Sequence, residues 1–248
     1  MKELLFGRNA VYESLRAGRR QAFRLLVAEG VQGKGRLAEI LALCAARKLS
    51  IERAPRSRLD KINPGHQGVA LETSGYPYGA LPDLLDIARH STSPPLFLIL
   101  DTLQDPQNLG TLLRTAEAVG VNGVLLPFKQ TVTVTPAVVN ASSGASEHLL
   151  IAQSNLAQAI SAFQEADVWV VGLDSGADAQ TPEQVHLDGS LALVVGSEGG
   201  GMRPLVRRSC DQLLRLPMQG KVESLNAAVA GSIALYLAWQ ARRNQVDR

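Results

Sequence analysis

The chain has 248 residues, with 25 Lys and Arg against 23 Asp and Glu, and a formal net charge of +2. This length suits one large domain or two modest ones, and 46% hydrophobic residues suffice for a sizeable core. No apolar run approaches the roughly 18 residues of a membrane span and no signal segment opens the chain, so we expect a cytoplasmic protein without a membrane partner. Aromatic residues make up only 4%, which argues against a platform of several base-stacking rings.

The near-neutral total conceals an uneven distribution of charge. Residues 1–75 carry 14 Lys and Arg against 7 Asp and Glu, a net charge of +7, whereas residues 76–248 carry 11 against 16, a net charge of −5. A basic segment beside an acidic one predicts a polyanion-binding unit attached to a separate chemical unit. Random variation in surface charge is the simpler alternative.

The two cysteines, Cys44 and Cys210, are far apart in the sequence, and neither belongs to a metal-ligand spacing. Cys44 falls on the apolar face of a predicted helix. We therefore expect both thiols to be core residues of a protein in a reducing compartment, and we expect no metal site.

The first 75 residues alternate short helices and strands. The patterns predict helices over 7–17 and 36–48, and strands over 23–28, 50–53 and 69–73. This alternation in so short a segment predicts a compact α/β sandwich. Basic residues near its turns suit the phosphates of a polyanion as a set, although a solvated surface is the simpler explanation for any one of them: Arg16, Arg19, Arg20, Arg53, Arg56, Arg58 and Lys61.

Prolines and a glycine within residues 76–82 mark a linker that continues through a short helix to residue 94. From residue 95 onward, strands and helices alternate. Apolar strands are predicted over 96–100, 123–126, 168–173, 192–195 and 213–216. Strands that are apolar on both faces indicate a mostly parallel sheet covered by helices. The predicted division is a domain at 1–75, a linker at 76–94 and a second domain at 95–248.

Two loops of the second domain have unusual composition. A glycine-rich loop, Gly196 to Gly201, follows an apolar strand, and the missing Cβ atoms let backbone approach a ligand closely. Leu216 and Pro217 end the next strand, because proline donates no ladder hydrogen bond. Ser224 is a suitable N-cap for a helix over 224–241 that is small or apolar almost all round. For either loop taken alone, the alternative is that its composition serves only to turn the chain.

The sequence lacks the signatures of two common cofactor sites, which disfavours a small-molecule oxidoreductase. No Gly-x-Gly-x-x-Gly follows the first strand of the second domain, so a dinucleotide-binding site is a poor fit. There is also no Walker A sequence, which removes a P-loop nucleotide site.

Three motifs occur in a fixed order: Asn108-x-Gly-x-x-x-Arg114, Gly196-Ser-Glu-Gly199, and Leu216-Pro-Met with Ser224-Leu-Asn226. Together they resemble the three motifs of the SpoU-type (TrmH-type) ribose 2′-O-methyltransferases of the SPOUT superfamily. Within that family the sequence is most similar to bacterial enzymes that methylate a guanosine of large-subunit ribosomal RNA. The resemblance implies an α/β fold with a deep trefoil knot, a small N-terminal RNA-binding domain, a homodimer, and S-adenosylmethionine (SAM) as cofactor.

The resemblance also implies roles for individual residues. The implied cofactor contacts, partly through backbone atoms, are Gly196, Leu216, Met218 and Leu225. The implied catalytic set is Asn108, Arg114, Glu198, Ser224 and Asn226. A guanidinium stays protonated in almost any site, so we interpret Arg114 as a clamp that steadies a developing alkoxide rather than as a base. Ser224 is either a helix cap or a catalytic group. Asn140 stands where the family often has a basic residue, and Lys129 is a candidate substitute.

The favoured function is SAM-dependent methylation of a ribose 2′-hydroxyl in large-subunit ribosomal RNA. Transfer RNA is the alternative substrate. A non-catalytic RNA-binding factor in ribosome assembly, with a relict cofactor pocket, is the alternative from another class. The complete set of motif residues argues against lost activity.

Overall fold

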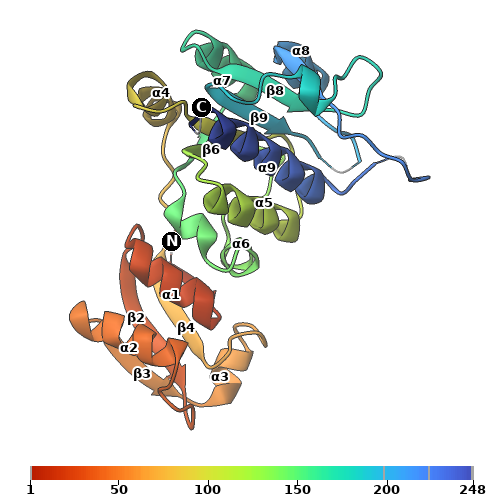
Figure 1. Cartoon of the computed structure of the whole chain (residues 1–248). Coiled ribbons are helices and arrows are strands. Elements are labelled where there is room, and N and C mark those ends of the chain that lie inside the picture. Colours follow the sequence, from red (N-terminus) through yellow and green to blue (C-terminus); the bar gives the residue numbers. More distant parts are fainter. Residues whose placement is uncertain (1, 198, 223, 247–248) are drawn as a thin grey trace. The chain divides into compact units, whose positions relative to one another are not determined.

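The computed structural model describes residues 2–197, 199–222 and 224–246, with side chains as far as residue 243. It separates into two compact units (Figure 1). Unit 1 contains Met1–Pro77 and Thr133–His148, and unit 2 contains Tyr78–Val132 and Leu149–Arg248. The sequence boundaries put residues 133–148 in the second domain, whereas the structure groups this segment with the first unit. The domain boundaries at 1–75 and 95–248 stay a prediction.

Unit 1 is built on a four-stranded sheet in the order β1-β4-β2-β3 (Figure 1). Strand β4 runs antiparallel to β1 and β2, while β2 and β3 are parallel. The expected α/β sandwich is present, although two of its elements, β1 and α3, were not predicted. The elements are β1 (Lys2–Phe6), α1 (Arg8–Ala17), β2 (Ala22–Ala28), α2 (Arg36–Ala46), β3 (Ser50–Ala54), α3 (Arg56–Asp60) and β4 (Val69–Ser74).

A buried ion pair joins the segment 133–148 to the N-terminal strands of unit 1. The segment contains α6 (Pro136–Ala141) and the short 3-10 helix η1 (Ala145–His148). Arg20 Nε donates to Glu147 Oε2 at 2.8 Å, and both side chains are 1% exposed. Arg20 Nη1 donates to Glu3 Oε2 at 2.6 Å. The inclusion of Arg20 among the phosphate contacts was therefore wrong, because its guanidinium neutralises a buried carboxylate instead.

Unit 2 is built on a six-stranded sheet in the order β10-β8-β9-β5-β6-β7, and each neighbouring pair is parallel. The expected parallel sheet is confirmed, with β7 as an unpredicted addition. Strand β10 ends at Leu214, so Leu216 lies in the following loop and not on the strand. The strands are β5 (Leu96–Leu100), β6 (Gly123–Pro127), β7 (Ile151–Ser154), β8 (Trp169–Leu173), β9 (Leu191–Val195) and β10 (Gln212–Leu214). The trefoil knot stays a prediction.

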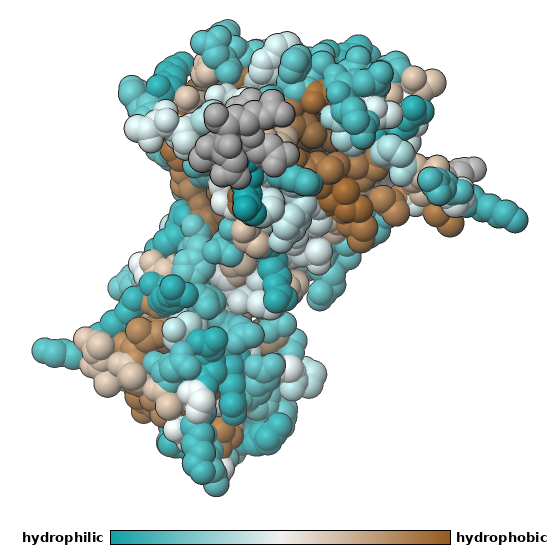
Figure 2. Space-filling model, in the orientation of Figure 1, coloured by the Kyte–Doolittle hydropathy of each residue, from teal (hydrophilic) through white to brown (hydrophobic). Residues whose placement is uncertain are grey.

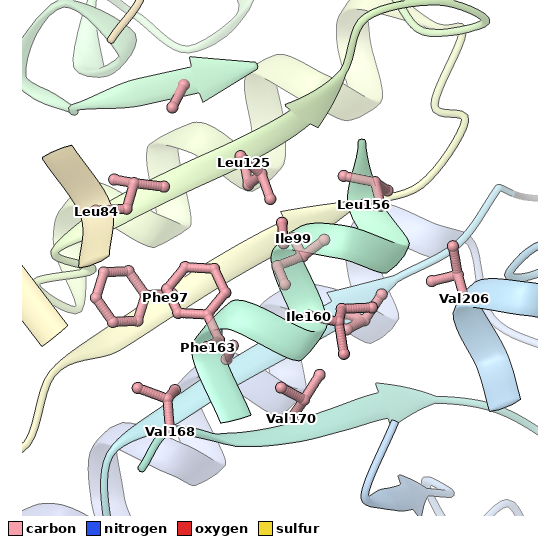
Figure 3. Packing of buried hydrophobic residues seen from close by; sticks show 14 of the residues in the cluster. Leu84, Phe97, Ile99, Leu125, Leu156, Ile160, Phe163, Val168, Val170 and Val206 are labelled. Carbon is pink, nitrogen blue, oxygen red and sulfur yellow. The ribbon is translucent and has the colours of Figure 1, made fainter. Parts of the chain in front are cut away.

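One face of this sheet packs on α4 (Leu81–His90), α7 (Leu156–Gln164) and α8 (Pro204–Ser209). Figure 3 shows the centre of this packing, where Phe97 of β5 meets Phe163 of α7. Their ring centroids are 4.8 Å apart, with the planes tilted by 40°. Alternate residues of each strand, such as Phe97 and Ile99, face this layer. The intervening apolar residues face the other side of the sheet, which therefore needs a second layer of helices.

The second face is covered by α5 (Pro106–Ala118) and α9 (Ala227–Val246). A Cβ on Gly231 of α9 would lie 2.6 Å from Leu112 Cδ2 and 3.1 Å from Val195 Cγ2. The small residues of α9 therefore bring the helix close to both α5 and the sheet. Thr115 and Ser232 add a hydroxyl–hydroxyl hydrogen bond of 2.9 Å between the two helices.

Both cysteines are shielded, as the sequence predicts. Cys44 is buried in unit 1, and Cys210 is half-buried in unit 2. Burial raises the pKa of the Cys44 thiol to about 11 and that of the Cys210 thiol to about 12. Both side chains consequently remain neutral thiols near neutral pH. Among the described helices, none combines the length and apolarity needed to cross a membrane.

Candidate cofactor-binding and catalytic site

The carboxyl ends of the parallel strands meet at one edge of unit 2, where loops after β8, β9 and β10 enclose a cavity of about 450 Å³. Sites for small molecules typically measure about 300–1,000 Å³. All four residues expected to contact the cofactor line this cavity: Gly196, Leu216, Met218 and Leu225. Asp174 and Ser175 also line it, from the loop after β8. The structure thus brings together residues that are up to 51 positions apart in the sequence.

The glycine-rich loop depends on Gly196, which directly follows β9. A Cβ at this position would lie 2.2 Å from the carbonyl carbon of Gly201 and 2.3 Å from Met202 N. The loop closes on itself through Ser197 and Gly201, whose backbone N–H groups each donate to the other's carbonyl oxygen at 3.0 Å. This tight closure places the backbone of Gly199 and Gly200 on the cavity wall with no side chain in between.

A buried carboxylate anchors the end of the same loop. Asp101, at the end of β5, is fully buried. Its two oxygens accept hydrogen bonds from Arg203 N at 2.8 Å and from Arg203 Nε at 2.7 Å. The sequence analysis missed this pair, although an aspartate directly after a wholly apolar strand was a visible signal.

The helix α9 begins at Ala227 and is capped by Asn226. Asn226 Oδ1 accepts from the backbone N–H groups of Ala228 at 2.9 Å and Val229 at 3.2 Å. The expectation that Ser224 caps this helix was therefore wrong, because the carboxamide two residues later satisfies the first-turn N–H groups. Ser224 is exposed and lines the cavity instead.

A chain of side-chain hydrogen bonds connects the N-termini of α5 and α9. Asn226 Nδ2 donates to Asn108 Oδ1 at 3.2 Å, and Asn108 Nδ2 donates to Asp105 Oδ2 at 2.9 Å. Asp105 caps α5, because its Oδ1 accepts from Gln107 N at 3.0 Å. The Gln107 amide and then the Asn108 amide hold the pKa of Asp105 below its ordinary value. Neither asparagine is among the described residues that line the cavity, but Asn226 stands between the lining residues Leu225 and Ala227, and its hydrogen bond ties Asn108 to it.

Asp105 was not among the predicted site residues. Its signal in the sequence is the Asp-Pro pair at the start of α5, which combines a favoured N-cap with proline at the first helical position.

The remaining predicted catalytic residues are placed differently. Arg114 lies on the exposed surface of α5 and, like Asn108 and Asn226, is not among the described residues that line the cavity. That position suits contact with a large substrate arriving from solvent. Glu198 lies outside the described residues. No cluster of His, Cys, Asp and Glu suited to a metal ion occurs in the part of the chain that the structure describes.

Comparison with known proteins gives matches over nearly the whole chain. A model of the SpoU rRNA Methylase family matches residues 95–236, and a model described as RNA 2′-O ribose methyltransferase substrate binding matches residues 4–79. A Bacillus subtilis relative, YacO, whose name places it with TrmH family tRNA/rRNA methyltransferases, is 41% identical; the match covers 98% of this chain and 97% of the relative.

Two solved structures match to different extents. The AdoMet-bound rRNA methyltransferase from Sinorhizobium meliloti is 25% identical with a TM-score of 0.80, over 96% of this chain and 87% of that one. A structure described as giving insights into 2-OH methylation of C/U34 on tRNA is 27% identical with a TM-score of 0.51, over 62% of this chain and 97% of that one.

With these matches, the fold and the cavity define a SAM-dependent RNA methyltransferase on a parallel α/β sheet. The chain belongs to the SpoU rRNA Methylase family.

The cavity has the composition that SAM requires. Adenine needs an apolar slot with backbone edges beside it, and Val195, Leu216 and Leu225 supply apolar surface next to the glycine backbone. The polar part of the cofactor needs donors and acceptors, which Ser197 and Asp174 supply on the same walls. Asp174 is held in place by Arg207, whose Nε donates to Asp174 Oδ2 at 2.9 Å.

We expect Gly196→Ala to raise the dissociation constant for SAM roughly 100-fold, because the new Cβ would overlap the loop backbone and force it to move. Isothermal titration calorimetry of both proteins measures this change. Gly189→Ala is the matched control, since a Cβ there meets no atom within 4 Å and Gly189 lies outside the cavity. Equal SAM affinity in Gly196→Ala and the control would contradict the role of this loop.

Proposed function

We propose that this protein transfers the methyl group of SAM to the ribose 2′-hydroxyl of a guanosine in large-subunit ribosomal RNA, in the cytoplasm. The observation that carries the proposal is the SAM-type cavity, with Asn226 between two residues that line it and Asn108 hydrogen-bonded to Asn226. A ribose placed against these carboxamides would lie beside the bound cofactor.

When bound, SAM would supply a methyl group on a sulfonium: the bond from sulfur to the methyl carbon would break as the 2′-oxygen attacks in line, a neutral thioether would leave, and the hydroxyl proton would pass to water. The protein therefore has to position two reactants and stabilise the charge that develops on the attacking oxygen. We assign Asn108 and Asn226 to holding the ribose, and the cavity residues Gly196, Leu216, Met218 and Leu225 to holding the cofactor. Ser224 and Glu198 complete the proposed catalytic set.

Arg114 is proposed to orient the nucleotide and to stabilise negative charge on the 2′-oxygen. A guanidinium has five N–H donors and no acceptor, so the role proposed for Arg114 is to donate hydrogen bonds and not to take the proton. Its exposed position on α5 leaves it accessible to an RNA phosphate or ribose.

The choice of ribosomal RNA rests on unit 1. The Sinorhizobium protein named as an rRNA methyltransferase matches 96% of the chain and thus includes unit 1, whereas the protein described with tRNA matches only 62%. The basic charge of residues 1–75 supports an RNA-binding role for this unit. Transfer RNA is the second candidate, since the Bacillus subtilis relative is named for both RNA classes.

The test is transfer of labelled methyl groups from SAM to unmodified ribosomal RNA and, separately, to unmodified transfer RNA. Label in 2′-O-methylguanosine of the large ribosomal RNA is the expected result. Label confined to transfer RNA would keep the chemistry and overturn the substrate. Binding of SAM without transfer to either RNA would favour an RNA-binding assembly factor.

We also propose a homodimer that covers α9. Val229, Ile233 and Tyr236 of this helix are 46%, 40% and 50% exposed, and Figure 2 shows hydrophobic surface over the helix. A helix with apolar residues on its solvent side usually packs against a partner. We expect sedimentation at micromolar concentration to give the mass of a dimer, and Tyr236→Glu to shift it toward the monomer. A strict monomer for the unsubstituted protein would contradict this assembly.

A further inference from the structure

Phe128 is unusual among the aromatic side chains of this protein. It follows β6 directly and is 66% exposed, more than any other aromatic residue in the described part of the chain. In contrast, Phe97 and Phe163 are wholly buried in the core of unit 2. A single exposed ring needs no special explanation by itself. A binding role for Phe128 therefore depends on whether its loop is held in place and on where that loop lies relative to the cavity.

The loop that carries Phe128 is fixed to the protein. Thr131 Oγ1 and Val132 N both donate to the carbonyl oxygen of Leu103, at 3.0 and 2.7 Å. Leu103 is itself buried. Gln130 adopts a left-handed backbone conformation with φ of 60°, which turns the chain sharply between Phe128 and these bonds. The ring is therefore presented from a defined loop and not from a loose one.

That loop lies at the edge of the sheet where the proposed reaction occurs. Strand β6 pairs with β5 in parallel, so their following loops emerge at the same edge as the cavity. The carbonyl of Leu103, which fixes the loop, stands two residues before Asp105. Asp105 in turn holds Asn108, the proposed ribose contact. Phe128 is thus connected to the proposed ribose site through one short stretch of backbone.

We propose that Phe128 is a base-stacking residue for the RNA substrate, at or next to the methylated nucleotide, with Lys129 beside it for a phosphate. This inference rests on the proposed function. An exposed aromatic ring next to a cation matches single-stranded RNA, whose unstacked bases bind aromatic faces and whose backbone binds cations. The next two residues, Lys129 and Gln130, are polar and exposed, so they do not continue the apolar surface of the ring as a protein interface would require. One ring can fix the plane of a base and with it the ribose attached to that base.

The first measurement compares Phe128→Ala, Phe128→Leu and Phe128→Trp in methyl transfer to unmodified ribosomal RNA. We expect Phe128→Ala to raise the KM for RNA about tenfold, in the usual range for loss of one base–aromatic stack. SAM affinity should not change. Phe128→Leu should resemble Phe128→Ala, whereas Phe128→Trp should resemble the unsubstituted protein, because stacking requires an aromatic face and not merely an apolar side chain.

Trp169→Ala is the matched control. Trp169 is also an exposed aromatic residue, at 47%, but it begins β8 and so lies at the opposite, amino-terminal edge of the sheet. We expect its removal to leave the KM for RNA unchanged.

A second measurement does not depend on turnover. Addition of a mixed-sequence single-stranded RNA oligonucleotide to SAM-saturated Phe128→Trp should quench fluorescence beyond the change in the unsubstituted protein. Quenching without any methyl transfer would retain the stacking role and overturn the proposed function. An unchanged KM in Phe128→Ala, full rescue by leucine, or absence of additional quenching would overturn the stacking role. Loss of the dimer in Phe128→Ala would reassign the ring to a protein interface.

Discussion

Arg114→Ala is expected to lower the rate of methyl transfer about 10²–10³-fold, the usual effect of removing one donor that stabilises developing charge. The dissociation constant for SAM should stay within about twofold, because Arg114 is not among the described residues that line the cavity. Single-turnover transfer from labelled SAM and calorimetric titration measure the two quantities. Arg114→Lys should recover only part of the rate, since an ammonium cannot reproduce the planar fork of a guanidinium.

The control for this substitution is Arg89→Ala, which removes another exposed arginine from a helix of the same unit, α4. We expect normal transfer in this variant. If Arg114→Ala also turns over at a near-normal rate with intact SAM binding, the role assigned to Arg114 is wrong.

Arg20→Ala is expected to lower the free energy of unfolding of unit 1 by about 3–5 kcal/mol, the usual cost of removing one partner from a buried ion pair. Arg20 and Glu147 are each 1% exposed, so the substitution leaves the Glu147 carboxylate without its counter-charge and away from solvent. Urea denaturation followed by circular dichroism measures the change. The double variant Arg20→Met, Glu147→Leu should recover much of the loss, because it removes both charges together.

Arg16→Ala provides the comparison, because Arg16 is 64% exposed and its pair with Glu13 is long, at 3.7 Å. Exposed pairs of this kind contribute about 0.5 kcal/mol or less. An unfolding midpoint for Arg20→Ala equal to that of Arg16→Ala would show that the buried pair does not hold the segment 133–148 to unit 1.

Local sequence pattern predicted the main strands of unit 2, because strands that are apolar on both faces leave few alternatives. Leu96–Leu100 is buried at every position and was assigned with its bounds as the structure has them. The ends of elements were less accurate. Serine and asparagine are both favoured N-cap residues, and the sequence alone does not say whether Ser224 or Asn226 caps α9. The hydrogen bond from Asn226 to Asn108 on another helix favours the second.

Pairs between distant residues could not be predicted from pattern. Arg20 and Glu147 are 127 positions apart, and Asp101 and Arg203 are 102 apart. Arg20, Glu147 and Arg203 look like ordinary surface charges in their own neighbourhoods, and the apolar strand before Asp101 marks that aspartate without indicating its partner. Their burial follows from how the elements pack, which no local periodicity specifies. For the same reason the basic residues of unit 1 suggested phosphate contacts as a set, while the structure assigns one of them to the interior.

The most direct test of the proposed function is the position of the methyl group on the RNA. RNA labelled from methyl-tritiated SAM is hydrolysed with alkali, which cleaves the backbone through free 2′-hydroxyls and therefore spares the bond after a 2′-O-methylated nucleotide. The proposed reaction predicts label in alkali-resistant dinucleotides, and its loss with Arg114→Ala. Label in mononucleotides would place the methyl group on a base and would contradict the ribose-directed role proposed for Asn108, Asn226 and Arg114.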